Sequence, residues 1–141
     1  MFPGRVARLV AVGVLVMSGL SGVAQDKPEQ MAQRSDESWL TLVDGAKYGE
    51  SWTAAAAAFK AAVTEDKWTQ AMESVRAPLG AVESRKLTSA VYSKTLPGAP
   101  DGEYVVVQYQ TIFTHKKEAV ETVVSAREKD GSWKMSGYFI K

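Results

Sequence analysis

The sequence predicts an α+β domain in which three N-terminal helices pack on a four-stranded antiparallel meander sheet. Two observations carry this prediction. Apolar residues recur with the 3.6-residue period of a helix as far as Gly80, and with the two-residue period of a strand from Ser84 onwards. Clusters of turn-forming residues then divide the second region into four consecutive runs. Helices followed by sequential strands are typical of α+β domains.

The first predicted helix has an amphipathic stripe. Its apolar residues at positions i, i+3, i+4 and i+7 are Trp39, Leu42, Val43 and Ala46. Asp36 and Glu37 precede the stripe, and we interpret them as charges at the helix start, where carboxylates interact favourably with the helix dipole. Pro28 is suited to opening the helix earlier. We therefore expect residues 25–34 to form a polar leader and the start of this helix.

Two further helices are predicted before Gly80. The second begins at Ser51, a suitable N-cap, and continues through the alanine run of residues 54–58 to Val63. Thr64 then caps the third helix. Its apolar stripe is Trp68, Met72, Val75 and Leu79. Gly80 ends the helical region.

The first two strands flank a loop. The first strand begins at Ser84, and the proline- and glycine-rich segment 97–102 ends it. The second strand runs from Glu103 to about Thr114, a length that indicates a central position in the sheet. Val105, Val107, Tyr109 and Phe113 share one face of it, and Tyr104, Val106, Gln108, Gln110 and Ile112 share the other.

The last two strands are joined by a hairpin signal. We expect a turn at residues 115–117 and a third strand from Ala119 to Glu128. Asp130-Gly131 is a strong two-residue hairpin signal, and a fourth strand follows from Trp133 to Ile140.

The first 24 residues have the order of regions found in secretory signal peptides. Arg5 and Arg8 precede an apolar run from Leu9 to Met17, and small residues follow up to Ala24. We predict cleavage between Ala24 and Gln25, which leaves residues 35–141 as a single α+β domain after the leader. The alternative is an uncleaved N-terminal anchor, but the apolar run is shorter than the roughly 20 residues that a membrane span needs.

Composition limits the partners of the exported chain. The sequence has no cysteine, so we expect no disulfide, no thiol chemistry and no lipid attached to a cysteine after cleavage. Removing Arg5 and Arg8 from 17 basic residues leaves 15 against 16 acidic ones, a net charge of −1. A nearly neutral domain with dispersed basic residues is a poor nucleic-acid binder. We interpret the adjacent pairs Arg85-Lys86 and Lys116-Lys117 as solvated charges, and expect a periplasmic or secreted protein without a stable membrane anchor.

Catalytic and metal-binding patterns are weak. His115 is the single histidine, and we interpret it as a solvated loop residue, so no metal site and no cofactor are predicted. Ser51 follows Gly49 in a faint echo of a nucleophile elbow, but capping explains it better. Glu118 and Glu121 fall on opposite faces of a strand and cannot share a substrate. No catalytic residue is assigned.

Several segments together resemble a family of exported bacterial proteins, the domain of unknown function numbered 4019. The resemblance covers nearly all of residues 37–141. It is carried by residues 37–44, Tyr48, Ser51-Trp52, Phe59, Trp68, 76–80, Ser84-Arg85, 96–104, 131–133 and 136–138. The family has no assigned activity, so the resemblance implies an exported compartment and no active site. More remotely, the chain resembles the cystatin-like and nuclear-transport-factor-like cone folds, many of which hold a pocket between helix and sheet.

The aromatic residues carry the remaining functional signal. Core packing is one interpretation of the tryptophans, which are in phase with apolar faces. The sharper hypothesis is a ligand pocket between helices and sheet. Its candidate residues are Tyr48, Trp52, Tyr104, Gln108, Tyr109, Gln110 and Tyr138.

Three functions remain open. The first, which we prefer, is a non-enzymatic domain that binds a small ligand or another protein. The second is an enzyme that uses a buried carboxylate or tyrosine as acid or base in a cone-shaped pocket. The third is an interaction module that forms a homodimer through its sheet.

Overall fold

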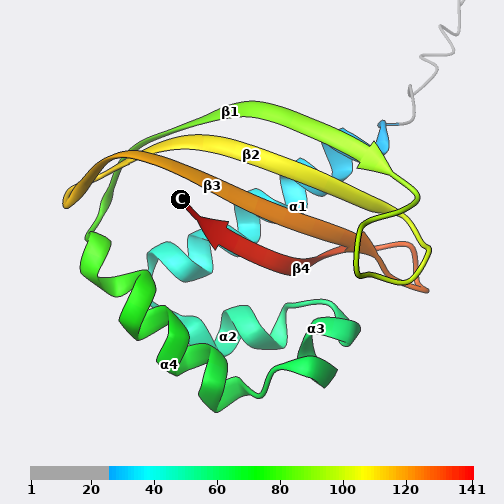
Figure 1. The fold of residues 1–141 in the computed structure, drawn as a ribbon, viewed down its shortest axis with the longest axis horizontal. Helices are drawn as coiled ribbons and strands as arrows, with labels where there is room; N and C mark the ends of the chain where they lie inside the picture. Colours follow the sequence, from blue (N-terminus) through cyan, green and yellow to red (C-terminus); the bar gives the residue numbers. More distant parts are fainter. Residues whose placement is uncertain (1–25) are drawn as a thin grey trace, which may run out of the picture.

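The structure is a computed structural model that describes residues 26–141, and it has the α+β architecture expected from the sequence (Figure 1). Four α-helices and a short 3-10 helix precede four strands. Their bounds are α1 Pro28–Asp44, α2 Tyr48–Thr53, α3 Ala57–Ala62, α4 Glu65–Val75, η1 Ala77–Leu79, β1 Val82–Ser93, β2 Tyr104–Phe113, β3 Lys116–Arg127 and β4 Trp133–Ile140. Within residues 26–141, no helix has both the length and the apolar character needed to span a bilayer. The predicted signal peptide, residues 1–24, lies outside the described residues.

The sheet is an antiparallel meander in the order β1-β2-β3-β4, which confirms the predicted topology. α1 contacts all four strands and crosses behind the sheet in Figure 1, while α2, α3 and α4 lie beyond β4. We call the face toward α1 the inner face and the opposite face the outer face. Burial on β2 follows the predicted alternation: Val105, Val107, Tyr109 and Phe113 are buried on the inner face. The core therefore lies between this face and the helices.

α1 turns a different stripe toward the core from the one predicted. Its buried residues are Ala32, Asp36, Trp39, Leu40 and Val43. Leu42 is only half-buried, and Ala46 lies beyond the end of the helix with a φ of 57°. The helix begins at Pro28, so Asp36 occupies its middle, and our interpretation of Asp36 as a charge at the helix start is wrong.

The predicted second helix is two helices, so the count of three is corrected to four. The chain leaves the helical conformation at residues 54–56, and Ala55 and Ala56 are buried. The Ala56 N–H donates to the Met135 carbonyl over 2.7 Å, and the Trp52 indole donates to the Val63 carbonyl over 2.7 Å. The small alanine side chains let the backbone approach the edge of β4, and this tertiary contact outweighs the helical propensity of alanine.

The remaining boundaries follow the sequence signals closely. The Thr64 side chain accepts a hydrogen bond from the Lys67 N–H at the start of α4, as predicted for an N-cap. The turn between β2 and β3 is shorter than expected, because Lys116 and Lys117 already belong to β3, and His115 is exposed. Gly131 has a φ of 85° in the β3–β4 connection, a conformation that favours glycine.

Aromatic rings join the helices to the sheet. Trp39 lies with its ring centroid 5.1 Å from that of Tyr138 and 6.1 Å from that of Trp68. Phe59 meets Trp68 edge to face at 5.2 Å. Trp39, Trp68 and Trp133 are buried, which confirms core packing for these three tryptophans.

Candidate functional site

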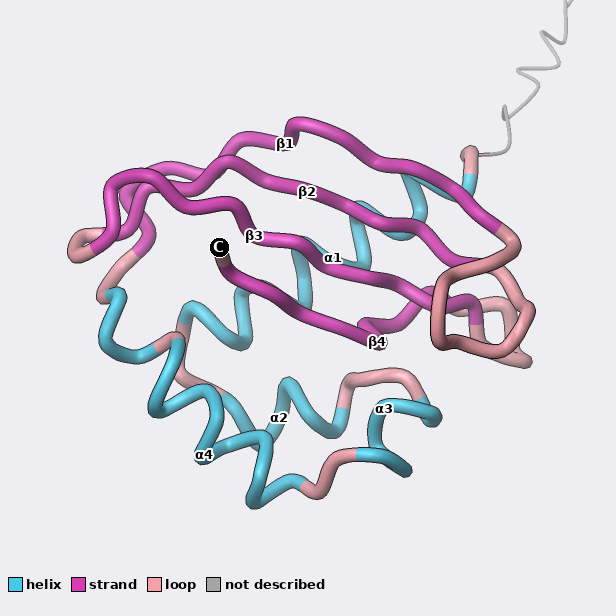
Figure 2. The backbone as a smooth tube through the Cα atoms, viewed as in Figure 1, coloured by secondary structure: helices cyan, strands magenta, loops and turns pink. Residues whose placement is uncertain are grey.

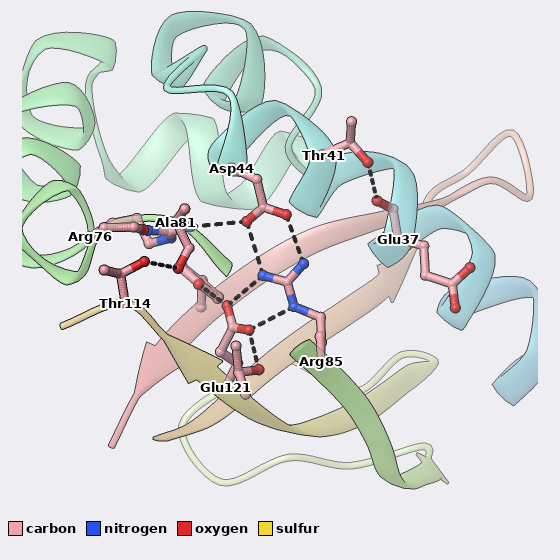
Figure 3. A network of polar contacts seen from close by, with 11 residues as sticks. Glu37, Thr41, Asp44, Arg76, Ala81, Arg85, Thr114 and Glu121 are labelled. Carbon is pink, nitrogen blue, oxygen red and sulfur yellow. Dashed lines mark hydrogen bonds and ion pairs between the residues drawn. The ribbon is translucent and has the colours of Figure 1, made fainter. Parts of the chain in front are cut away.

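A charged network lies between the helices and the inner face of the sheet, buried at Glu121 and reaching the surface at Asp44 (Figure 3). Its centre is Glu121 of β3, whose side chain is 0% exposed. Glu121 accepts hydrogen bonds from Arg85 Nε at 2.7 Å and Nη2 at 3.2 Å, and from Thr111 Oγ1 at 2.5 Å. The Tyr138 hydroxyl donates to Oε2 of Glu121, the oxygen that also accepts the bond from Arg85 Nη2. Four donors therefore surround this carboxylate.

Arg85 extends the network from β1 to the end of α1. Its Nη1 and Nη2 atoms donate to the two oxygens of Asp44 over 2.7 and 2.9 Å. Arg76, which follows α4 and is 3% exposed, donates to Asp44 over 3.1 Å and to the Gly80 carbonyl over 2.8 Å. Its guanidinium lies 4.6 Å from the centroid of the Phe113 ring. Two carboxylates and two guanidinium groups thus join α1, α4, β1 and β3.

The network favours the charged forms of Asp44 and Arg85 and the neutral form of Tyr138. Burial alone raises the pKa of Asp44, but the hydrogen bonds and charges of Arg85 and Arg76 outweigh burial and lower that pKa below its ordinary value. Burial lowers the pKa of Arg85, and Asp44 and Glu121 more than reverse this effect. Burial, together with the charge of Glu121, raises the pKa of the Tyr138 phenol, which keeps its proton. These groups stabilise one another, and none is poised to exchange a proton with a substrate.

A second buried carboxyl lies on α1 without a cation beside it. Asp36 is 0% exposed and accepts a hydrogen bond from the Ser125 hydroxyl through Oδ1, while its Oδ2 has no partner within the described residues. Burial raises the pKa of Asp36 to about 8; the Ser125 bond opposes the shift and the Glu37 charge adds to it. The neighbouring Tyr109 hydroxyl is also buried without a partner among these residues. Asp36 is therefore mainly protonated at neutral pH.

The outer face of the sheet carries exposed apolar side chains among its polar ones. Val91 of β1 is 58% exposed and Phe139 of β4 is 61% exposed. Val91 pairs with Val106, and Val106 pairs with Val124, so three valines form a row across β1, β2 and β3. All described helices lie on the other side of the sheet or beyond its β4 edge (Figure 1). No helix of the described chain covers this row.

A hollow opens at one end of the outer face, beneath the loop between β1 and β2. This loop curls across the right-hand end of the sheet in Figure 2. The hollow has a volume of about 460 Å³. Its walls are Leu96, Pro97, Gly98, Ala99, Tyr104, Val124, Ser136, Gly137 and Phe139.

The residues that line this hollow are held in place by contacts within the domain. A Cβ atom on Gly137 would lie 3.2 Å from Cε2 of Phe139, so glycine lets the aromatic ring lie close to the β4 backbone. The Tyr104 hydroxyl donates to the Pro100 carbonyl over 2.6 Å, which ties the loop to β2. The Ser136 hydroxyl donates to the Val124 carbonyl over 3.3 Å. The polar side chains are thus engaged, and the walls carry no charged residue.

Comparison with known families settles the resemblance. Residues 35–138 match the family model described as "Protein of unknown function (DUF4019)". The chain belongs to this DUF4019 family. No curated protein matches the chain. In this DUF4019 domain, segments that carry the resemblance supply Asp44, Arg76, Arg85 and Tyr138 of the buried network. Residues 136–138, which supply Tyr138, also meet residues 96–104 at the outer hollow.

The seven predicted pocket residues of the DUF4019 domain do not converge on one pocket. Tyr48, Tyr109 and Tyr138 are buried between the helices and the inner face, and Trp52 is half-buried there. Tyr104, Gln108 and Gln110 lie on the outer face of β2, as their phase predicted. Tyr104 alone among the seven lines the outer hollow.

The sequence interpretation missed the charged residues of the interior. Arg85 is not a solvated charge, because adjacent residues of a strand point to opposite faces and only Lys86 of the pair is exposed. Glu118 and Glu121 do point to opposite faces, as predicted, and Glu121 is the buried one. The two-residue alternation of side chains along β3 could have identified Glu121 as buried. Glu121 lies on the same face of the strand as Ala119 and Val123, and all three are buried.

Metal chemistry finds no support in this interior. Within residues 26–141, no three side chains of the ligating types His, Asp and Glu converge as a metal site requires. The buried carboxylates are placed instead beside arginine, tyrosine, threonine and serine donors. The outer face with its hollow is one of the surfaces that remain open to a ligand.

Proposed function

We propose that this protein is an exported, non-enzymatic domain that binds a small apolar molecule in the hollow between the β1–β2 loop and the outer face of the sheet. The observation that carries the proposal is an apolar hollow of about 460 Å³ on a sheet face that no helix of the described chain covers. Ligand pockets commonly have volumes of about 300–1,000 Å³ and apolar or aromatic walls with a few fixed polar groups.

The walls of the hollow favour an uncharged ligand. Phe139, Tyr104 and Val124 provide apolar and aromatic surface, and the wall residues include no acid, lysine, arginine or histidine. The Tyr104 and Ser136 hydroxyls donate to backbone carbonyls, so neither donor is left for a charged group. A ligand with a buried charge would lose its hydration without gaining a partner.

The valine row favours an elongated ligand. Val124 lies in the hollow and pairs with Val106, which pairs with Val91. Two inter-strand spacings of about 4.8 Å carry this row about 10 Å beyond the hollow. A hydrocarbon chain that starts in the hollow and follows the row buries apolar surface along its whole length, at roughly 25 cal/mol per Å².

The predicted signal peptide supports ligand binding outside the cytoplasm. The order of charged, apolar and small residues in residues 1–24 is that of a cleavable signal peptide, and no cysteine follows the predicted cleavage site for lipid attachment. The domain thus meets its ligand in the periplasm or outside the cell.

The enzymatic alternative is less well supported. Glu121 and Asp44, two of its carboxylates, are neutralised by Arg85 and Arg76, and the Tyr138 phenol donates to Glu121. Asp36 is the one buried carboxyl of the described chain without an ion pair, and it is absent from the walls of the described hollows.

A fluorescent apolar probe tests the proposal. Residues 25–141 are expected to bind N-phenyl-1-naphthylamine at one saturable site, and Val124→Lys is expected to weaken binding at least about tenfold because it places a charge in the apolar floor. Val120→Lys is the matched control: Val120 lies on the same face of β3, is 38% exposed and is not part of the hollow. Its affinity should stay within about twofold of the wild-type value. Absence of saturable binding, or equal loss in both variants, contradicts the proposal.

One observation favours a second candidate, a homodimer through the sheet. Val91 and Phe139 are more than half exposed on the outer face, where a second copy of the chain would bury them. Sedimentation equilibrium separates the two functions. Ligand binding predicts a monomer at high protein concentration, whereas a dimer that Val120→Lys and Phe139→Ser both dissociate would favour the interaction module.

A further inference from the structure

We propose that a second surface of this domain, on the helical side, binds an extended segment of a partner protein that carries an aliphatic or aromatic side chain beside a lysine or arginine. The surface is a groove bounded by α1, α2, the start of α4 and the start of β4, and we call it the α1–β4 groove. It is separate from the outer hollow, so this inference goes beyond the proposed ligand binding.

The α1–β4 groove consists of two hollows that adjoin. The volumes of the hollows are about 590 and 500 Å³, and Leu42 and Ala54 line both. The first is also lined by Gly49, Glu50, Thr53 and Glu65, and the second by Ser35, Ser38, Trp39, Trp133, Lys134 and Met135. Shared walls make one continuous depression, large enough for several side chains of a bound segment.

The middle of the groove is apolar. Trp39, Trp133 and Met135 are buried beneath it, and Leu42 stands half-buried between the two hollows. Like Met31, Leu42 is an apolar residue of α1 outside the buried stripe. An apolar side chain placed against Leu42 would complete its burial and remove its exposed apolar surface from water.

The serine and threonine hydroxyls of the groove are already used. Ser35 donates to the Trp133 carbonyl over 2.5 Å, Ser38 to the Arg34 carbonyl over 3.3 Å and Thr53 to the Gly49 carbonyl over 3.1 Å. These bonds leave the apolar contacts and the acidic residues at one end as the features that select an occupant.

The α2 end of the groove is acidic. Glu50 and Glu65 are exposed at the α2 end, and neither forms an ion pair or a side-chain hydrogen bond within the described residues. A Cβ atom on Gly49 would lie 2.7 Å from the Glu65 carboxylate, so glycine gives this carboxylate room over α2.

Charge complementarity identifies the class of occupant. A lysine or arginine of the partner fits between Glu50 and Glu65. A calcium ion takes six to eight oxygen ligands, and no third His, Asp or Glu converges on the two carboxylates within residues 26–141. The polarity of the groove therefore matches a peptide that runs with its basic residue toward α2.

Selection from a phage-displayed library of random heptapeptides tests this proposal. We expect residues 25–141 to enrich sequences that contain an apolar residue and a lysine or arginine within a few positions of each other. Leu42→Arg is expected to lower retention of the enriched phage at least about tenfold, because it fills the centre of the groove with a cation. Val75→Arg is the matched control, since Val75 is an exposed apolar residue of α4, 52% exposed and outside the groove.

Charge variants test the direction of the peptide. The double variant Glu50→Gln and Glu65→Gln should lose the preference for lysine and arginine, while Glu73→Gln with Glu118→Gln, both exposed and outside the groove, should retain it. Melting curves by circular dichroism confirm that each variant is folded. The proposal is overturned if no sequence is enriched over the bare support, or if the Leu42→Arg and Val75→Arg domains retain the phage equally. Val124→Lys, selected in parallel, should retain the phage, which separates this result from failure of the outer hollow.

Discussion

Glu121→Ala is expected to lower the free energy of unfolding by about 3–5 kcal/mol, the cost of removing one partner from a buried ion pair. The substitution leaves the Arg85 Nε atom and the Thr111 and Tyr138 hydroxyls without their acceptor in the interior. Urea denaturation followed by circular dichroism measures the change.

The control for this variant lies on the same strand. Glu118 is exposed on the outer face of β3, and Glu118→Ala should change stability by less than about 0.5 kcal/mol. A loss of less than about 1 kcal/mol in Glu121→Ala would contradict the structural role that we assign to the network.

Asp36→Asn is expected to have the opposite effect and to raise the free energy of unfolding at pH 7 by about 2–4 kcal/mol. An asparagine oxygen can still accept the Ser125 hydrogen bond. The asparagine, however, needs no proton to remain neutral in the core. The wild-type carboxyl must take up a proton on folding, because its pKa rises from 3.8 to about 8.

The raised pKa of Asp36 also determines how the stability of the domain depends on pH. Between pH 4 and pH 8 the folded state holds a proton on Asp36 that the unfolded state has lost. Folding therefore takes up a proton in this window, and the contribution of Asp36 to stability falls as pH rises, by at most about 1.4 kcal/mol per pH unit. Urea denaturation at pH 5, 6, 7 and 8 should show that the gain in Asp36→Asn grows with pH. Glu73→Gln, an exposed control on α4, should follow the wild type at a constant offset; parallel profiles for Asp36→Asn would contradict the buried acid.

The sequence allowed prediction of the elements with strong local signals. Thr64 and the run after it located α4, and the change of period near Ser84 located the sheet and the order of its strands. The resemblance to the DUF4019 family, which the family model confirms, was visible in the same segments. These features depend on residues close together in the chain, so local reasoning finds them.

The features that local reasoning missed depend on distant partners. The alanine run is interrupted because Ala56 donates a hydrogen bond to Met135 of β4, 79 residues later in the chain. Arg85 and Asp44 meet only after β1 has packed against α1. The helical period places Asp36 on the buried side of α1, because it lies three residues before Trp39. We nevertheless assigned it to the helix start, where carboxylates are favoured.

The candidate site also combines a feature that a local pattern predicts with features that depend on distant segments. The alternation of β2 placed Tyr104 on the outer face, yet the hollow also needs the β1–β2 loop, Val124 and Phe139. No local pattern indicates that residues 96–99 fold back over β3 and β4, because these segments come together only when the strands have assembled into the sheet. The glycine at position 137 is meaningful in hindsight, since it makes space for the Phe139 ring.

An NMR titration can show whether an apolar molecule binds in the hollow beneath the β1–β2 loop. Uniformly ¹⁵N-labelled residues 25–141 are titrated with N-phenyl-1-naphthylamine, and the amide shifts are mapped onto the structure. We expect the largest shifts in residues 96–104 and at Val124, Gly137 and Phe139, with the amides of α2 and α4 unchanged. Largest shifts at Trp39 and Tyr138 in the core, or shifts spread evenly over the sheet, would contradict this expectation.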